Sequence, residues 1–292
     1  MNANVESFFH AATSTWTHLV WGPRSRAAAI IDPVLDFDLA SGRIGHASAR
    51  AVLDAAQDAG LRIDWILETH AHADHLTAAD WLRGALAAEG RHVPIGVGAR
   101  IVEVQRHFRR VFALEDALVA DGSQFDRLFA DDARFAIGAL EVRVLATPGH
   151  TPDSVSYLVG DAVFVGDTLF APSRGTARCD FPGGDAATLY RSIQRLYALP
   201  HDTRVFLCHD YPAPGSAPEC LTSIAAQKTG NVQLRADTSA ADYVALRTQR
   251  DATLAAPRLL YPALQVNIRA GALPPADREG RRFLRLPVAA AE

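Results

Sequence analysis

The chain contains very little lysine, cysteine and methionine. Only Lys228 is a lysine among its 29 basic residues, and the 292-residue sequence has three cysteines and one methionine. The arginine-for-lysine skew is more typical of genomic base composition than of function. An odd number of cysteines cannot all pair, and the spacing of Cys179, Cys208 and Cys220 matches no zinc knuckle or disulfide framework. We therefore expect reduced thiols in a cytoplasmic protein.

Long hydrophobic runs and an excess of positive charge are also absent. Apolar stretches such as residues 27–31 fall far short of the roughly 20 residues that span a bilayer. The N-terminal region lacks the basic and apolar parts of a signal peptide. Acidic residues (33) outnumber basic ones (29), and the formal charge of −4 argues against nucleic-acid binding. We expect a soluble protein without nucleic-acid or membrane partners.

The remaining composition is that of a globular protein with a sizeable core, since 49% of the residues are hydrophobic and 21% are charged. Apolar, β-branched runs predict strands at residues 17–21, 27–31, 63–68, 94–97, 134–137, 141–145, 154–159, 162–165 and 205–208. Helical spacing predicts helices at residues 48–59, 76–88, 99–111, 185–199 and 240–254. Strands thus come in two batches, each followed by helices. This order favours an α+β fold with two β layers and outer helices over one doubly wound parallel sheet.

The character of the sequence changes after about residue 235, where prolines punctuate a stretch that has little apolar sequence. Such a stretch is too poor in apolar residues for a core of its own. We predict a catalytic domain at residues 1–235 and a C-terminal extension at residues 236–292 that packs on it.

Polar side chains that suit a metal follow several of the predicted strands. Residues 69–75 read Thr-His-Ala-His-Ala-Asp-His, directly after the strand at 63–68. His150, Asp167 and His209 each follow a later strand. Imidazole and carboxylate groups suit zinc, iron or manganese. A single histidine after a strand is usually only hydrogen-bonded, but four such strand ends indicate one shared metal site.

With these motifs the sequence resembles the metallo-β-lactamase superfamily over roughly residues 15–215. The resemblance implies an αββα sandwich with a metal cleft at one edge of its two sheets. In the dinuclear hydrolases of the superfamily, the residues matching His70, His72 and His150 hold one metal. Those matching Asp74, His75 and His209 hold the second, and Asp167 bridges the two.

Longer motifs resemble one branch, the persulfide dioxygenases, and in particular the bacterial β-lactamase hydrolase-like proteins. These motifs are Gly-Thr-Ala-Arg-Cys-Asp-Phe-Pro-Gly-Gly at 175–184, Thr-Leu-Tyr-Arg-Ser-Ile at 188–193, His-Asp-Tyr at 209–211 and Leu-Gln-Val-Asn-Ile-Arg-Ala-Gly at 264–271. The resemblance implies one Fe(II) per chain, held by His70, His150 and Asp167. Two histidines and one carboxylate leave positions open on a redox-active iron for O₂ and a sulfur substrate.

The same resemblance implies oxidation of glutathione persulfide by O₂ and water to sulfite and glutathione. His72, Asp74, His75 and His209 would then surround the iron or hold a second metal. We assign Asp74, His75 and Tyr211 as catalytic candidates. The substrate-binding candidates are Arg178, Tyr211, Lys228, Asn231, Asn267 and Arg269. A homodimer is compatible with the family.

Several alternative residue roles and functions stay open. Arg178 could form a structural salt bridge with Asp180 instead of binding substrate. The animal enzymes carry an Asn-Pro-Arg segment where this chain reads Gly-Asn-Val-Gln at 230–233, so its carboxylate clamp must differ. Cys179 is either a reactive thiol or a buried inert one. The main alternative function is a dinuclear zinc thioesterase or lactonase that resembles glyoxalase II, in which a metal-bound hydroxide attacks a carbonyl. A secreted β-lactamase and a non-catalytic sensor are further alternatives, and the sequence favours neither.

Overall fold

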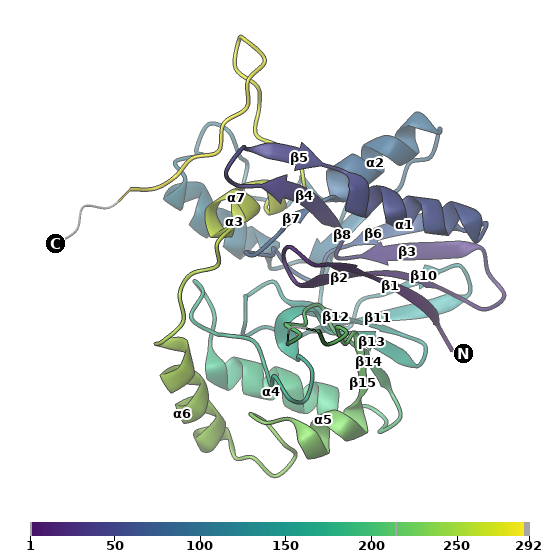
Figure 1. Cartoon of the computed structure of the whole chain (residues 1–292), viewed down its shortest axis with the longest axis vertical. Coiled ribbons are helices and arrows are strands. Elements are labelled where there is room, and N and C mark those ends of the chain that lie inside the picture. Colours follow the sequence, from purple (N-terminus) through teal and green to yellow (C-terminus); the bar gives the residue numbers. More distant parts are fainter. Residues whose placement is uncertain (1, 214, 289–292) are drawn as a thin grey trace.

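Two six-stranded sheets face each other at the centre of the protein (Figure 1), as seen in a computed structural model that describes residues 2–213 and 215–288. The first sheet has the strand order β1 (Asn4–His10), β2 (Thr15–Trp21), β3 (Ala27–Ile31), β6 (Arg62–Leu67), β8 (Ile95–Gly98) and β9 (Arg127–Phe129). The second has the order β10 (Arg134–Ile137), β11 (Leu140–Ala146), β12 (Val155–Val159), β13 (Ala162–Phe164), β14 (Arg204–Phe206) and β15 (Leu221–Ser223). A small third sheet joins β5 (Arg43–Gly45), β4 (Val34–Asp38) and β7 (Leu76–Thr77).

Helices cover the outer face of each large sheet (Figure 1). On the first sheet lie α1 (Ala47–Asp58), α2 (Ala79–Ala88), α3 (Ile101–Val111) and α7 (Leu260–Asn267). On the second lie α4 (Ala186–Tyr197), α5 (Ile224–Gly230) and α6 (Ala240–Asp251). The predicted α+β class and αββα arrangement are therefore confirmed. Of the helices in the described part of the chain, none combines the length and apolar character needed to cross a membrane.

Alternation along the strands explains the layers. Ile30 of β3 packs against the helices of the first sheet, whereas its neighbours Ala29 and Ile31 face the second sheet. On the second sheet, Phe164 faces the first sheet while the preceding Val163 packs under the helices. Successive side chains of a strand point to opposite faces, so an unbroken apolar run is what a strand buried on both faces requires.

The structure corrects several predicted elements. The helix predicted at 76–88 begins only at Ala79, because Leu76 and Thr77 pair with β4 as strand β7. The strand predicted at 205–208 ends at Phe206. Strands β1, β4, β5, β9 and β15 and helices α5 and α7 were not predicted. These elements are short or only half-buried, which weakens the hydrophobic periodicity on which the prediction depends.

The segment after residue 235 contacts both layers of helices. Helix α6 lies against α4, and Tyr243 is buried in the core beneath them. Helix α7 lies against β7, and its Val266 is buried in the core of the first sheet. The division of the chain at residue 235 stays a prediction.

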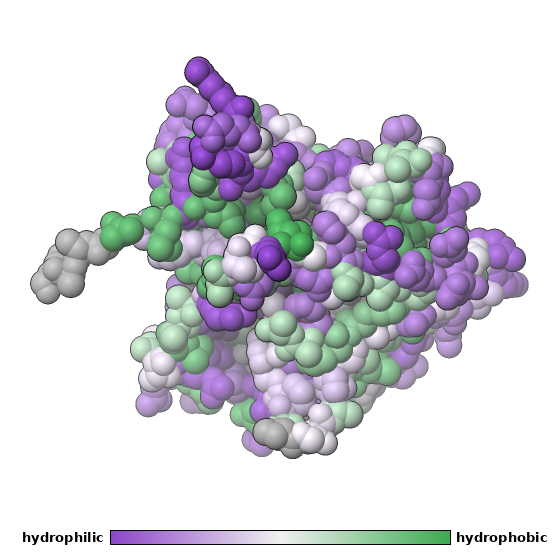
Figure 2. All heavy atoms as spheres, turned by 45° about the horizontal axis from the view of Figure 1, so that its top comes forward, coloured by the Kyte–Doolittle hydropathy of each residue, from purple (hydrophilic) through white to green (hydrophobic). Residues whose placement is uncertain are grey.

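Near the C-terminal end, hydrophobic side chains are exposed. Figure 2 shows them where the last described residues leave the body of the protein. Phe283, Leu286 and Val288 are 59%, 67% and 87% exposed, respectively. The homodimer stays a prediction.

A buried histidine between the sheets makes stability depend on pH. His18 lies 5.3 Å from Phe164 and 5.5 Å from Phe206, measured between ring centroids. Its Nε2 donates to the carbonyl of Leu207 (3.0 Å), so its Nδ1 accepts from the hydroxyl of Ser7 (2.8 Å). Burial lowers the pKa of His18 from 6.5 to about 4.

We expect this histidine to destabilise the protein in acid. Its contribution is fully present above pH 6.5, the value in the unfolded chain, and is lost as the pH falls toward 4. Between pH 7 and 4.5 the metal-free protein should lose about 2 to 3 kcal/mol more unfolding free energy than its His18→Gln variant, as measured by urea unfolding. Equal losses in both proteins would contradict the prediction.

Candidate metal centre

Four loops, each following a strand, bring the candidate metal ligands together. The loop after β6 carries His70, His72, Asp74 and His75, and the loop after β11 carries His150. Asp167 lies in the short 3₁₀ turn η1 (Gly166–Thr168) after β13, and His209 follows β14. The first loop belongs to one sheet and the other three to the second sheet. The site therefore lies where the two sheets meet.

The first cluster consists of His70, His150 and Asp167. One ligand atom from each lies within 4.8 Å of the others, and all three side chains are buried. His150 Nε2 is 3.6 Å from Asp167 Oδ2, and the rings of His70 and His150 are perpendicular with centroids 5.1 Å apart. These are the two histidines and one carboxylate that the resemblance to the persulfide dioxygenases assigns to iron.

The second cluster contains His72, Asp74, His75 and His209, again with ligand atoms within 4.8 Å of one another. Asp74 Oδ2 lies 3.2 Å from His209 Nε2, and Asp74 Oδ1 lies 3.4 Å from His75 Nδ1. Asp167 Oδ1 also lies 3.2 Å from His209 Nε2, so Asp167 connects the two clusters. His72 lies between the two clusters, because its ring centroid is 3.9 Å from that of His70 and 4.2 Å from that of His75. The assignment of His72 to one of two metals stays a prediction.

The donor atoms of these clusters fit a metal ion. Within the described residues, His70 Nε2, His72 Nδ1 and His75 Nε2 are buried without any hydrogen-bond partner. Buried polar atoms are nearly always hydrogen-bonded, so a concentration of unsatisfied ones needs an explanation. A cation that accepts these lone pairs supplies it. The chemistry of the donor set suits zinc, iron or manganese alike.

The histidines differ in protonation because their neighbours differ. Burial and the adjacent His72 hold the pKa of His70 well below its ordinary value. Burial also opposes protonation of His72, but the Asp32 carboxylate, 3.1 Å from Nε2, outweighs it and raises its pKa to about 9. For His209, the nearby carboxylates of Asp167 and Asp74 likewise outweigh burial and raise its pKa to about 10. His70 is therefore a neutral imidazole at pH 7, as a metal ligand must be.

Hydrogen bonds behind the ligands set which nitrogen faces the cleft. His150 Nδ1 donates to the carbonyl of Arg178 (2.7 Å), and His209 Nδ1 donates to the carbonyl of Ser14 (3.0 Å). Each bond leaves the Nε2 atom free to face the cleft. Partners of this kind orient metal-bound histidines and fix their tautomers.

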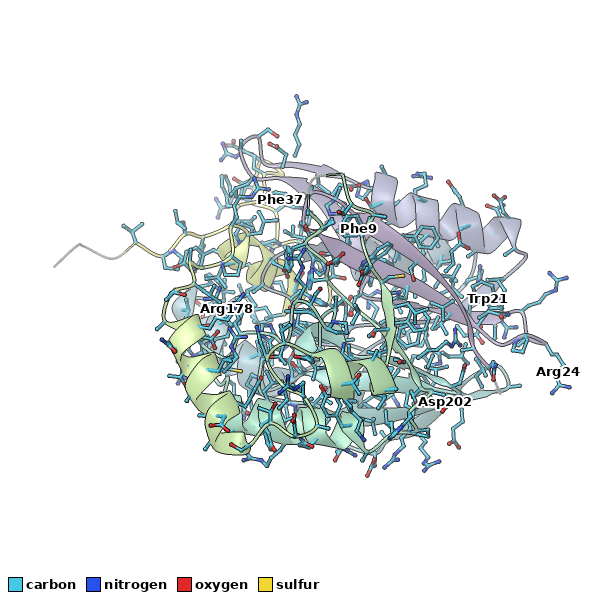
Figure 3. All side chains as sticks on the ribbon, turned by 60° about the horizontal axis from the view of Figure 1, so that its bottom comes forward. Phe9, Trp21, Arg24, Phe37, Arg178 and Asp202 are labelled. Carbon is cyan, nitrogen blue, oxygen red and sulfur yellow. The ribbon has the colours of Figure 1, made fainter. Side chains whose placement is uncertain are left out.

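A cavity of about 600 Å³ opens beside the clusters and is lined by Asp74, His150 and Asp167 at the metal centre. Arg178 and Tyr211, both predicted to bind substrate, line it as well. Arg178 also forms the predicted salt bridge with Asp180 (2.6 Å) and donates to the carbonyl of Ala255 just beyond α6 (2.7 Å). Figure 3 shows Arg178 near one end of α6. Tyr211 is half-exposed, with its ring nearly parallel to that of His209 and the centroids 6.1 Å apart.

Four other arginines, which the sequence did not single out, also line the cavity: Arg174, Arg247, Arg250 and Arg258. Arg247 is buried and paired with Asp251 (2.6 Å), and Arg174 lies 3.8 Å from Asp210. Arg250 and Arg258 make no ion pair or side-chain hydrogen bond with the described residues. Arg250 and Arg258 lie close together in the sequence, but no other signal pointed to them, because an arginine-rich chain offers many such candidates.

The other predicted substrate-binding residues lie elsewhere, and among the described residues none of them lines this cavity. Lys228 donates to the carbonyl of Tyr197, and Arg269 donates to that of Ala117. Asn231 is buried and donates to the carbonyl of Gly175. Asn267 donates to main-chain carbonyls of the His70–His75 loop. These contacts point to structural roles.

Two of the three cysteines lie near the site. Burial raises the pKa of Cys179 to about 12, so its thiol is protonated at neutral pH and fits the inert interpretation. Cys208 is buried and donates to Asp32 Oδ2 (3.7 Å). Asp210, which directly follows the candidate ligand His209, accepts from the Glu219 amide (2.7 Å).

Comparison with known proteins gives relatives over the whole length. The chain is 45% identical to a "Probable metallo-hydrolase" of Burkholderia pseudomallei, covering 97% of this chain and 98% of that protein. It is 43% identical to "Glyoxylase B2" of Dictyostelium discoideum, covering 98% and 97%. The first of these relatives is named as a metallo-hydrolase.

Proteins named for persulfide chemistry are more distant. The human "Persulfide dioxygenase ETHE1, mitochondrial" is 32% identical over 71% of this chain and 68% of its own length. The crystal structure of ETHE1 from Myxococcus xanthus superposes with a TM-score of 0.72 at 30% identity, covering 92% of this chain and all of that one. Residues 11–209 match the family described as the metallo-beta-lactamase superfamily. The strand-end ligands, the αββα sandwich and this match agree, and the chain belongs to the metallo-beta-lactamase superfamily.

Proposed function

We propose that the chain is a persulfide dioxygenase that uses one Fe(II) per chain. The reaction converts glutathione persulfide, O₂ and water into glutathione, sulfite and two protons. The observation that carries the proposal is the first cluster, because two histidines and one carboxylate on one side of an iron ion are typical of non-haem Fe(II) oxygenases. The resemblance to ETHE1 proteins supports it. The proposed setting is the cytoplasm, where thiols stay reduced.

In this proposal His70, His150 and Asp167 hold the iron, which supplies the redox chemistry that zinc lacks. The carbonyl of Arg178 keeps the His150 ring oriented, and burial keeps His70 neutral. Asp74 lines the cavity beside this cluster and is placed to accept a proton from the persulfide or from water, and the buried His75 contacts Asp74 (3.4 Å). Tyr211 closes one side of the cavity and positions the substrate.

The cavity also suits the carrier of the persulfide. Glutathione has two carboxylates, which guanidinium groups bind well. Arg250 and Arg258 line the cavity wall and are free of competing ion pairs with the described residues. Arg178, by contrast, already contacts Asp180. We propose that Arg250 and Arg258 replace the arginine that the Asn-Pro-Arg segment provides in the animal enzymes.

The reaction itself is the first test. Protein purified without air should contain about one iron per chain and consume O₂ promptly when glutathione persulfide is added, with one sulfite formed per O₂ consumed. Metal analysis, an oxygen electrode and sulfite determination measure these quantities. Two zinc ions, no O₂ uptake and hydrolysis of a glutathione thioester would overturn the proposal.

A second candidate is a dinuclear hydrolase of the glyoxalase II type. The second cluster favours it, because His72, Asp74, His75 and His209 form a complete ligand set for another metal. The relative named "Glyoxylase B2" points the same way. In such an enzyme these four residues would hold a second metal, and the metals would activate water for hydrolysis of a thioester.

Two histidine variants separate the candidates by metal content. His70→Ala removes one of three ligands of the first cluster, and we expect it to lose the iron and all O₂ uptake. His75→Ala changes only the second cluster, so it should keep about one metal per chain, with affinity lowered by no more than roughly 10–100-fold. A drop from two metals to one in purified His75→Ala protein would instead favour the dinuclear hydrolase.

A further inference from the structure

Two helices of the segment after residue 235 contact the loops that carry the candidate metal ligands. Neither contact comes from a candidate ligand, and Asn267, which the sequence suggests as a substrate-binding residue, does not line the cavity. Each is made by one buried polar side chain: Asp251, the last residue of α6, and Asn267, the last residue of α7.

Asp251 acts on the His150 side of the site. Its Oδ2 accepts from the main-chain amide of Cys179 (2.8 Å). The peptide group that this amide belongs to is also that of the Arg178 carbonyl, which accepts from His150 Nδ1 (2.7 Å). Asp251 therefore fixes one end of the peptide unit whose other end orients His150. Two hydrogen bonds separate α6 from a candidate ligand.

The position of Asp251 is itself determined by a buried arginine. Arg247 Nη2 lies 2.6 Å from Asp251 Oδ1, one helical turn away. Arg247 Nη1 donates to the Thr176 carbonyl (3.1 Å) and to Gln233 Oε1 (3.0 Å), which ties the same loop at a second point. Arg247 is only 1% exposed. A buried carboxylate with such a partner is held far more tightly than a surface one, because an unpaired buried charge is costly.

Asn267 acts on the loop between β6 and β7. Its Nδ2 donates to the carbonyls of His72 (2.7 Å) and His75 (2.8 Å), and its Oδ1 accepts from the Thr77 amide (2.9 Å). Both N–H donors of the Asn267 amide are thus used on the loop that holds most of the second cluster. A carboxylate of the same shape can accept but cannot donate, so only an amide satisfies this arrangement.

The close approach of α7 explains part of its sequence motif. Gly271 has φ +88°, and a Cβ there would lie 2.9 Å from the Asp80 amide nitrogen. A larger residue would push the end of α7 away from β7 and α2. The motif at 264–271 thus combines an amide that binds the ligand loop with a glycine that allows the contact.

We propose that Asp251 and Asn267 are positioning residues of the metal centre, through which α6 and α7 hold the His150 loop and the His70–His75 loop in their metal-binding geometry. The proposal depends on the loops alone, and it holds for iron or zinc and for either candidate reaction. It assigns the segment after residue 235 an indirect part in metal binding, through the loops that carry the ligands.

The test measures Zn²⁺ affinity of the full chain by competition with a chelator, together with amide hydrogen exchange of the metal-free protein. Asn267→Asp keeps the shape and the acceptor and removes both donors. Asp251→Ala removes both contacts, whereas Asp251→Glu keeps the carboxylate. We expect Asn267→Asp and Asp251→Ala each to weaken Zn²⁺ binding by about 10–100-fold, and Asp251→Glu to weaken it less.

Hydrogen exchange localises the effect. In metal-free protein, Asn267→Asp should speed exchange within residues 70–77, and Asp251→Ala within residues 176–181. Matched controls on the same helices are Gln265→Ala, whose side chain binds Tyr261 and Arg285 carbonyls, and Asp242→Asn, which contacts Ser239. Both controls should bind Zn²⁺ as the unmodified protein does.

A purely structural role has a different signature. It would lower the thermal midpoint of the metal-free variants while leaving Zn²⁺ affinity and loop exchange equal to those of the controls, and that result would overturn the proposal. If Asp251→Ala does not fold, Asp251→Asn keeps an acceptor for Cys179 and loses the pairing with Arg247. Asp251→Asn should then also weaken Zn²⁺ binding, by less than the loss expected for Asp251→Ala.

Discussion

The structure depends on one constraint: several imidazole and carboxylate groups are buried at the same point, and the described residues cannot satisfy them. His70, His72 and His75 present nitrogen atoms that no described hydrogen bond uses. Asp167 and Asp74 lie within 3.2 Å of His209, so charges of both signs are confined in a small volume. Burying these groups without a cation costs folding free energy, whereas a bound cation would use the same groups as ligands.

The two sheets make this concentration possible. Backbone hydrogen bonding is completed within each sheet, so the loops at the strand ends are free to direct side chains inward. Because β13 and β14 run parallel, Asp167 and His209 leave the sheet on the same side. The loop after β6 approaches from the other sheet. The metal centre is therefore a product of sheet packing as much as of any one motif.

The cavity beside the metal centre has two chemically distinct parts. Its lining includes Asp74, His150 and Asp167 of the metal centre and five arginines, two of them, Arg250 and Arg258, free of ion pairs with the described residues. A substrate with a reactive group at one end and carboxylates at the other would match both parts. Three of these arginines, Arg247, Arg250 and Arg258, come from the segment after residue 246, which also supplies Asp251. The same segment thus shapes the cavity and contacts a ligand loop.

The sequence by itself determined the layers and the candidate ligands. The hairpin of β2 and β3 and the apolar strands β11 to β13 could be predicted, because strand periodicity and turn residues are local. His70, His150, Asp167 and His209 could be predicted because each follows a recognisable strand. Only the tertiary structure decided how these side chains come together, with His72 beside both His70 and His75. It alone revealed Arg250 and Arg258 on the cavity wall, and Asp251 and Asn267 behind the ligand loops. Asn267 lies in the motif at 264–271, but its role, like those of the other three residues, arises from contacts between distant segments, up to 195 residues apart in the chain.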